Sequence, residues 1–150
     1  PSIDAAFYHE ITGQADVKLV LGQTHALLQN AYAALVTSGT ATLETALFSV
    51  PEVVCYKGSY ISYQIARRVI DRSIIKHISL VNLIMDREVV RELIQDDLTT
   101  TNLVRELKSI TSDDDRRKQM LDQYRTLADK LGGGGASELT ASLITGRLRE

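Results

Sequence analysis

The sequence predicts an α/β fold in which helices cover the faces of a parallel β-sheet. Short apolar runs rich in β-branched residues alternate with segments whose apolar residues recur at helical spacing. Glycine, proline or a polar turn separates most of these segments. This rhythm is typical of βαβ units, because parallel strands need a crossover connection. A length of 150 residues suits one hydrophobic core, so residues 1–150 are expected to form a single domain.

Short apolar runs that end at turn residues are predicted to be strands. VKLVL stops at Gly22, ALVT stops at the turn 38–40, and VVCY follows Pro51. Nearly continuous apolar runs of this length suit strands that are buried on both faces. The expected strands are 17–21, 34–37 and 53–56, with 77–80 as a short last one.

Helices are predicted where a capping side chain precedes an apolar stripe, as at Asp4, Thr24, Asp86 and Thr101. Ser112, followed by three aspartates, begins a longer helix, because its oxygens satisfy free amides and negative charge suits a helix N-terminus. Most of the last third is therefore expected to be helical. The predicted helices cover 4–11, 24–31, 40–50, 61–70, 86–94, 101–107, 112–131 and, after a run of four glycines, 137–148. The stripe of the long helix is expected to be Leu121, Tyr124, Ala128 and Leu131.

Composition excludes several classes of protein. With 17 basic and 19 acidic residues the net charge is −2, which argues against a general nucleic-acid binder. Cys55 is the single cysteine, so neither an internal disulfide nor a multi-cysteine metal site is expected. The three histidines are far apart in the sequence, and we expect no metal and no cofactor.

The apolar runs and the N-terminal residues allow a prediction of the cellular location of the chain. No uninterrupted apolar run is long enough to span a bilayer, and no signal peptide is visible. With one cysteine, this favours a reducing cytoplasmic location. The chain begins at Pro1 without methionine, as we expect of a piece of a longer protein.

The segment 37–44, TSGTATLE, carries the strongest functional signal because it joins a predicted strand to a helix. Ligands of parallel sheets bind outside the carboxyl ends of the strands, and free amides at a helix N-terminus attract phosphate. Gly39 lets the backbone approach an anion, while Ser38 and Thr40 add hydroxyl donors. Glu44 lies on the same helix face and could accept two ribose hydroxyls. A capped helix with a solvated glutamate is the alternative from local chemistry alone.

Other familiar fingerprints are absent. The sequence contains neither the P-loop pattern GxxxxGK[ST] nor the dinucleotide pattern GxGxxG. Ser38 stands in TSGTA rather than in a GxSxG nucleophile elbow, which argues against a hydrolase.

Four segments resemble the lipid-A-disaccharide synthase family of Gram-negative glycosyltransferases. They are PSIDAAFY at the start, LVLGQTHALLQNA, ALVTSGTATLETALFSVPEVVCYK and ISLVNLIMDREVVRELIQ, so that the resemblance extends over nearly the whole chain. It implies a Rossmann-like parallel sheet with flanking helices, namely most of the C-terminal, nucleotide-sugar-binding domain of a two-domain GT-B enzyme.

The resemblance also implies roles for individual residues. Ser38, Gly39 and Thr40 would hold the UDP diphosphate and Glu44 the ribose, and the Gly22-Gln23 turn would lie beside the uracil. Asn82 and Gln95 match positions near the donor phosphate or sugar. From the residues alone, Asn82 is more often a turn former or helix cap, and Gln95 an ordinary helix-end residue.

The implied reaction transfers the diacylglucosamine of UDP-2,3-diacylglucosamine to lipid X and releases UDP. The catalytic base is expected in an N-terminal domain of the same protein, so no catalytic residue is named here and this chain alone is expected to be inactive. Another UDP-sugar GT-B enzyme, such as a peptidoglycan glucosaminyltransferase or an epimerase, is the alternative within the class. A noncatalytic α/β interaction module is the alternative outside it.

A basic cluster on the predicted helix 61–70 and just beyond it allows two interpretations. Arg67, Arg68, Arg72 and Lys76 could contact anionic lipid headgroups on the cytoplasmic face of the inner membrane. Cations at a helix C-terminus also simply complement the helix dipole, and this is the interpretation we favour.

Overall fold

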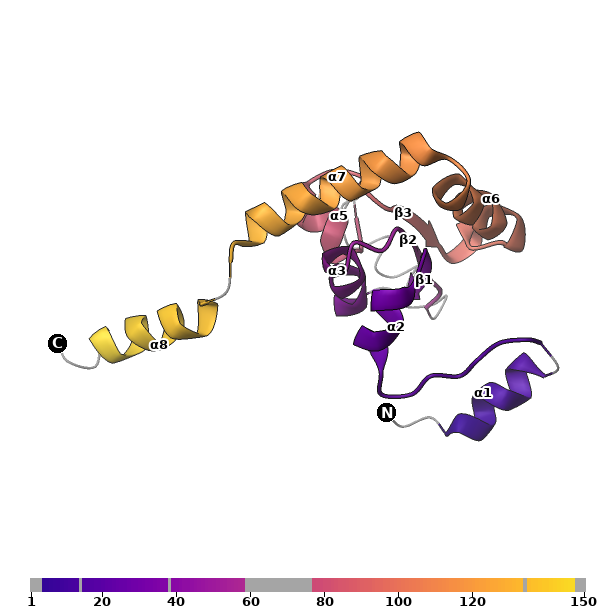
Figure 1. Ribbon diagram of the computed structural model, residues 1–150, viewed down its shortest axis with the longest axis horizontal. Helices are drawn as coiled ribbons and strands as arrows, with labels where there is room; N and C mark the ends of the chain where they lie inside the picture. The colour runs from indigo at the N-terminus through magenta and orange to yellow at the C-terminus, as the bar shows by residue number, and fades with distance from the viewer. Residues whose placement is uncertain (1–3, 14, 38, 59–76, 134, 148–150) are drawn as a thin grey trace. The chain divides into compact units, whose positions relative to one another are not determined.

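The computed structural model describes residues 4–13, 15–37, 39–58, 77–133 and 135–147 (Figure 1). The chain divides into two compact units, Pro1–Ala31 and Tyr32–Glu150. Each unit is described by itself below. The predicted helix 61–70 and the basic cluster from Arg67 to Lys76 lie outside the described residues.

The first unit contains two short helices, α1 (Ala5–Thr12) and α2 (Thr24–Asn30). The Asp4 carboxylate accepts from the amide of Ala6 at 3.0 Å, which confirms the predicted cap. Thr24 is the first residue of α2 rather than its cap.

The prediction of a strand over 17–21 is wrong, because these residues are irregular. Their apolar side chains are largely exposed within the structure; Val17 is 58% exposed and Leu21 is 56% exposed. A strand is stabilised by a hydrogen-bonded neighbour. The described residues of the first unit form no β-strand, so residues 17–21 have no neighbouring strand to pair with in that unit.

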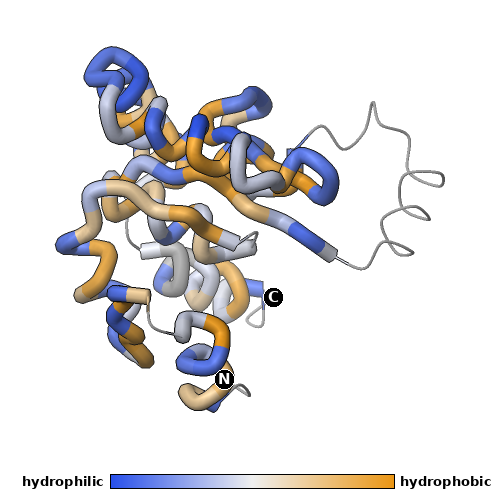
Figure 2. Tube along the Cα trace, turned by 90° about the vertical axis from the view of Figure 1, so that its right-hand side faces the viewer, coloured by the Kyte–Doolittle hydropathy of each residue, from blue (hydrophilic) through white to orange (hydrophobic). Residues whose placement is uncertain are grey.

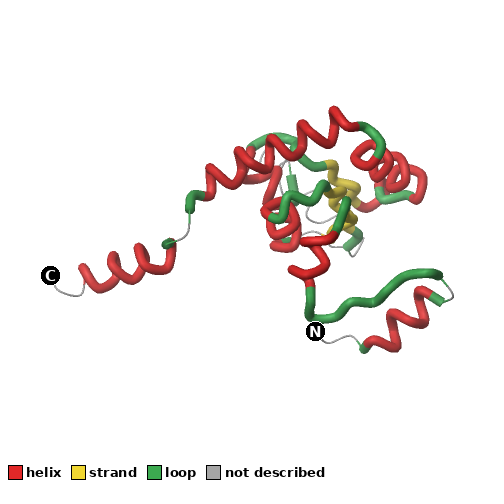
Figure 3. Tube along the Cα trace, viewed as in Figure 1, coloured by secondary structure: helices red, strands yellow, loops and turns green. Residues whose placement is uncertain are grey.

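The second unit is built around a parallel sheet of three strands in the order β1 (Ala34–Thr37), β2 (Glu52–Tyr56) and β3 (Arg91–Ile94). Figure 3 shows the strands in yellow among the helices. The first two strands confirm the predicted 34–37 and 53–56. Val53 and Val54 in the middle strand are completely buried, as expected for a strand covered on both faces.

Helices flank this sheet and complete the core. They are α3 (Thr40–Leu47), α5 (Leu80–Met85), α6 (Thr100–Thr111) and α7 (Asp114–Leu131), with the 3-10 turn η1 (Gln95–Asp97) after β3. A last helix, α8 (Ala136–Arg147), follows α7 in the chain, and its described side chains are exposed. Helix α3 contacts β1, β2, α5 and α7, whereas α6 contacts β2, β3 and α7. Figure 2 colours the chain by hydropathy and shows its apolar segments in orange. The buried core comprises Ala46, Val53, Val54, Val81, Met85, Val89, Val90, Leu93, Ile110, Met120, Tyr124 and Leu127. This architecture confirms the predicted α/β class.

The predictions for 77–80 and 86–94 are both wrong in type. Ser79 caps α5 where a strand was expected, and its Oγ accepts from the Asn82 amide. Asp86 has a φ of 52° and ends α5 instead of beginning a helix. Residues Arg91–Ile94 form the third strand, because Leu93 packs into the core beside β2 and tertiary pairing outweighs the local helical spacing.

Two helix starts shift by one or two residues from the predicted positions. Thr99, not Thr101, caps α6 by accepting from the Asn102 amide at 3.2 Å. Asp113, not Ser112, caps α7 by accepting from the Arg116 amide at 3.0 Å.

The buried stripe of α7 is also corrected. Tyr124 is buried as predicted, but Met120 and Leu127 fill the remaining core positions, while Ala128 and Leu131 are exposed. Among the described helices, none is both long and apolar enough to cross a membrane.

Candidate functional site

The carboxyl ends of the three strands meet at one edge of the sheet, since all of the strands are parallel. Gly39 and Thr40 follow β1, Gly58 follows β2 after one intervening residue, and Gln95 follows β3. The side-chain Nε2 of Gln95 donates to the backbone oxygen of Gly58 at 3.3 Å. This bond ties the ends of β2 and β3 together at the edge where the sequence predicts a ligand.

The turn after β1 has the backbone that the sequence predicts for an anion site. Gly39 has a φ of 128°, a conformation that side chains rarely adopt, and Thr40 opens α3. Within the described residues no side chain caps the start of α3, so its first amides and positive dipole end are not closed off by a cap. Both residues are exposed. Ser38 lies outside the described residues.

Glu44 lies four residues after Thr40 on α3 and is half-buried. Residues at this spacing share one face of a helix, and the side chain leans toward the N-terminus. From its position in the helix, the Glu44 side chain is expected to lean toward the turn at Gly39, and its predicted contact with a ribose stays a prediction.

Asn82 is completely buried in α5, and its side chain binds only other parts of the protein. The Oδ1 atom accepts from the amides of Val89 and Val90 at 2.7 and 3.0 Å. The Nδ2 group donates to the Val90 oxygen at 2.8 Å and to Glu92 Oε1 at 2.9 Å. An asparagine amide supports about four hydrogen bonds, and all four are made here. Any contribution of Asn82 to a ligand site is consequently one of positioning.

Glu92 is a residue that sequence reasoning missed. Its carboxylate accepts from the amide of Ile78 at 3.1 Å, from that of Ser79 at 2.9 Å, and from Asn82. It thus fixes the chain just before α5 to the middle of β3. A carboxylate placed directly before the apolar pair Leu93 and Ile94 was the sequence signal that could have drawn attention to it.

Gln95 stands at the end of β3 with a φ of 51°, a conformation uncommon for residues other than glycine. Its side chain is buried, with 6% exposure, and reaches Gly58 as described above. Left-handed residues of this kind cluster at ligand sites. The fold therefore turns Gln95 toward the strand ends, where sequence alone would have made it a helix-end residue.

Gly22 and Gln23 belong to the first unit, and the structure places them only within it. Gly22 has a φ of 68°, and Gln23 precedes α2. Within the ranges that the structure describes, no group of His, Cys, Asp or Glu side chains could hold a metal ion.

A second unpredicted feature lies at the opposite edge of the sheet. Glu52, the first residue of β2, is completely buried, and neither carboxylate oxygen has a hydrogen-bond partner among the described residues. Burial raises its pKa to about 9. The pKa of Tyr124 is also raised, first by burial and then by the Glu52 charge. Because Glu52 begins its strand, this pair is separate from the edge that holds Gly39 and Gln95.

Comparison with known proteins places the chain in a family. A model of the lipid-A-disaccharide synthetase family matches residues 5–142. A lipid-A-disaccharide synthase of Acidobacterium capsulatum is 41% identical over 138 residues, which cover 92% of this chain and 34% of the relative. The enzyme of Syntrophus aciditrophicus is 39% identical, with 93% of this chain and 37% of the relative covered. That of Psychromonas ingrahamii is 42% identical over 69% of this chain and 26% of the relative. The chain thus spans about a third of the length of its first two relatives, and it belongs to the lipid-A-disaccharide synthetase family.

Proposed function

We propose that this chain is the donor-binding part of a lipid-A-disaccharide synthase and binds UDP-2,3-diacylglucosamine. The observation that carries the proposal is the sheet edge where the start of α3, which no described side chain caps, stands with the linked Gly58 and Gln95. Family membership supplies the chemical class of the ligand. The whole enzyme would transfer the diacylglucosamine to lipid X, forming lipid A disaccharide 1-phosphate and UDP.

Each proposed contact follows from the chemistry of its residue. The Gly39 and Thr40 backbone, with the Ser38 hydroxyl, binds the diphosphate at the positive end of α3. Glu44 accepts hydrogen bonds from the ribose hydroxyls. The Gly22-Gln23 turn contacts the uracil, and Gln95 contacts the donor phosphate or sugar.

The proposed mechanism divides the chemistry between two domains. Negative charge develops on the departing diphosphate, and amides and hydroxyls at the start of α3 stabilise it without reorganising. The base that deprotonates the acceptor hydroxyl belongs to an N-terminal domain, which is the proposed partner of this chain. We propose a cytoplasmic location. For the basic residues from Arg67 to Lys76, contact with lipid headgroups remains the alternative to the favoured interpretation, in which they complement a helix dipole.

Titration with UDP tests the proposal directly. Backbone amide signals of Gly39, Thr40, Gly58 and Gln95 are expected to shift saturably in NMR spectra, and UDP is expected to bind more tightly than ADP or GDP. Equal binding of the three nucleotides removes the uracil contact from the proposal. Shifts that cluster at Glu52 and Val89, or no binding at all, contradict the site and favour a noncatalytic module.

Glu44→Ala separates the ribose contact from the phosphate contact. Loss of a charge-assisted hydrogen bond costs about 1.5–3 kcal/mol, so UDP affinity is expected to fall roughly tenfold or more. Affinity for inorganic pyrophosphate, which has no ribose, is expected to stay nearly constant. Calorimetric titration measures both, with Glu138→Ala on α8 as the control. Equal losses for both ligands, or collapse of the thermal transition, would assign Glu44 a structural role.

The chain alone is expected to lack synthase activity, because no catalytic base is proposed within it. Purified chain mixed with UDP-2,3-diacylglucosamine and lipid X should give no disaccharide above background by mass spectrometry. Robust turnover would place the base in these residues and overturn the division into two domains.

A further inference from the structure

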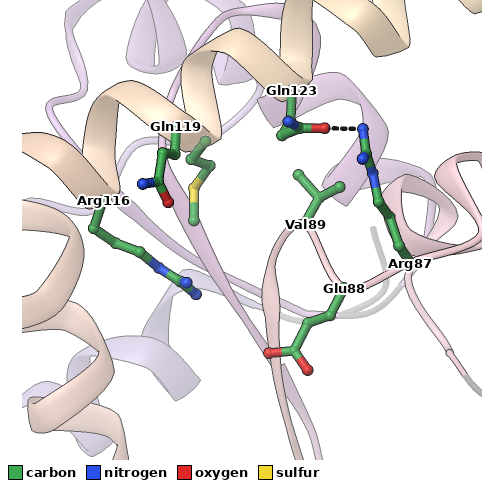
Figure 4. A pocket seen from close by; sticks show the side chains of 7 residues that line it. Arg87, Glu88, Val89, Arg116, Gln119 and Gln123 are labelled. Carbon is green, nitrogen blue, oxygen red and sulfur yellow. Dashed lines mark hydrogen bonds between the residues drawn. The ribbon is translucent and has the colours of Figure 1, made fainter.

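A polar pocket lies between α7 and the loop that precedes β3 (Figure 4). The cavity has a volume of about 260 Å³. One wall is the α7 face with Arg116, Gln119 and Gln123, and the other is the loop 87–89. Pockets for drug-sized ligands measure roughly 300–1,000 Å³, so this one suits a smaller molecule. Since its residues precede β3 or begin α7, it stands apart from the edge that carries Gly39 and Gln95.

Of the three charged side chains that line this pocket, two have a side-chain partner among the described residues and one has none. The Arg87 guanidinium donates to the side-chain oxygen of Gln123, which Figure 4 shows as a dashed line between loop and helix. Glu88 pairs with Arg91 at 3.4 Å. Among the described residues, no side-chain hydrogen bond or ion pair of Arg116 is present, although this residue is half-buried. Arg87 and Arg116 therefore both keep their positive charge, and Arg116 is the one whose guanidinium has no side-chain hydrogen bond among the described residues.

The floor of the pocket is apolar. Val89 is 6% exposed and Met120 is 3% exposed, and both belong to the core of the second unit. The amides of Gln119 and Gln123 add polar groups above this floor. A guanidinium presents planar donors that suit phosphate and carboxylate oxygens. An apolar floor beside it suits a ligand with a short apolar stem.

We propose that this cavity, the Arg116 pocket, binds a small oxyanion, a phosphate or carboxylate group, with Arg116 as its principal ligand-binding residue. Gln119 donates a further hydrogen bond, and the link between Arg87 and Gln123 holds the two walls in place. The Glu88 carboxylate lowers the affinity, because it lines the same pocket with a negative charge.

Two probes test the proposal on the 150-residue chain in the presence of excess UDP. Inorganic phosphate and isobutyrate are titrated at constant ionic strength. The side-chain amides of Gln119 and Gln123 and the backbone amides of residues 87–89 are the NMR reporters. Saturable shifts are expected with at least one probe, and the probe that binds identifies the oxyanion. Absence of saturable shifts with both overturns the proposal.

Variants assign the binding to Arg116. Arg116→Gln is expected to weaken the binding probe roughly tenfold or more, since a charge-assisted hydrogen bond is lost. Arg125→Gln, on the same helix but outside the pocket, is the matched control and is expected to leave the affinity unchanged. Glu88→Gln is expected to raise the affinity. The Arg116 backbone amide, which donates to Asp113, is retained in every variant. Equal affinity of Arg116→Gln and the unmodified chain overturns the proposal.

Discussion

Glu52→Met is expected to raise the free energy of unfolding by several kcal/mol at neutral pH and to remove a pH dependence of stability. The Glu52 side chain is fully buried, and both of its oxygens lack a partner among the described residues. Leaving a buried polar group unsatisfied costs about 1–3 kcal/mol. Methionine is unbranched, similar in length and apolar, so it can fill the same space without that cost.

The sign of the pH effect follows from the raised pKa of Glu52. Burial moves this pKa from 4.5 to about 9. Between these values the folded state holds a proton that the unfolded state has released, so stability falls as the pH rises. The slope is roughly 1.4 kcal/mol per pH unit within this window. The contribution of Glu52 to the free energy of unfolding is therefore most favourable below pH 4.5, and it is lost as the pH rises through about 9.

Urea unfolding from pH 5 to pH 9 measures both effects. The difference between the chain and Glu52→Met isolates Glu52 from the other titrating groups. Glu52→Gln is expected to lose the slope while keeping a buried polar group, and Tyr124→Phe is expected to keep the slope. Parallel pH profiles for the chain and Glu52→Met would mean that Glu52 does not titrate in this window.

Local sequence signals predicted the elements that local chemistry determines. Asp4 caps α1 through a bond two residues away, and the strand 34–37 and the turn at Gly39 stand where the apolar run and the glycine placed them. The predicted caps of α6 and α7 lie one or two residues from the observed caps, Thr99 and Asp113, because neighbouring polar residues can cap a helix equally well.

Elements that depend on distant neighbours were predicted less well. The run 17–21 has good strand composition but no strand to pair with in its unit, whereas Arg91–Ile94 has helical spacing and pairs with β2. Strand formation is decided by the partner, which a single sequence does not display. Consequently the last strand of the sheet was expected too early in the chain, at 77–80 instead of Arg91–Ile94.

The candidate site shows the same division. The turn at Gly39 was predicted because strand, glycine and helix start are consecutive in the chain. Glu92 was not, because its partners Ile78, Ser79 and Asn82 are ten or more residues away. Gln95 was expected near the donor only through the family resemblance, since its bond to Gly58 joins residues 37 positions apart.

Asn82→Ala is expected to destabilise the second unit by at least about 3 kcal/mol. The change removes four hydrogen bonds and leaves the buried amides of Val89 and Val90 without acceptors. Each buried group left unsatisfied costs about 1–3 kcal/mol. A loss of this size lowers the midpoint of thermal unfolding by roughly 10 °C in a domain of this length. Calorimetry measures it, and Asn102→Ala, whose bond to the Asp97 oxygen is exposed, is the control with a small expected effect.

Asn82→Asp distinguishes a network of specific bonds from simple packing, because the two side chains have nearly the same shape. The oxygen that accepts from Val89 and Val90 is retained. The Nδ2 donor becomes an oxygen that faces the Glu92 carboxylate and the Val90 carbonyl, so two negative charges meet where a hydrogen bond stood. Protonation of one carboxyl removes this repulsion, so the variant is expected to regain stability as the pH falls. Equal loss of stability in Asn82→Asp at pH 4 and pH 8, relative to the unmodified chain, would show that the Glu92 contact contributes nothing.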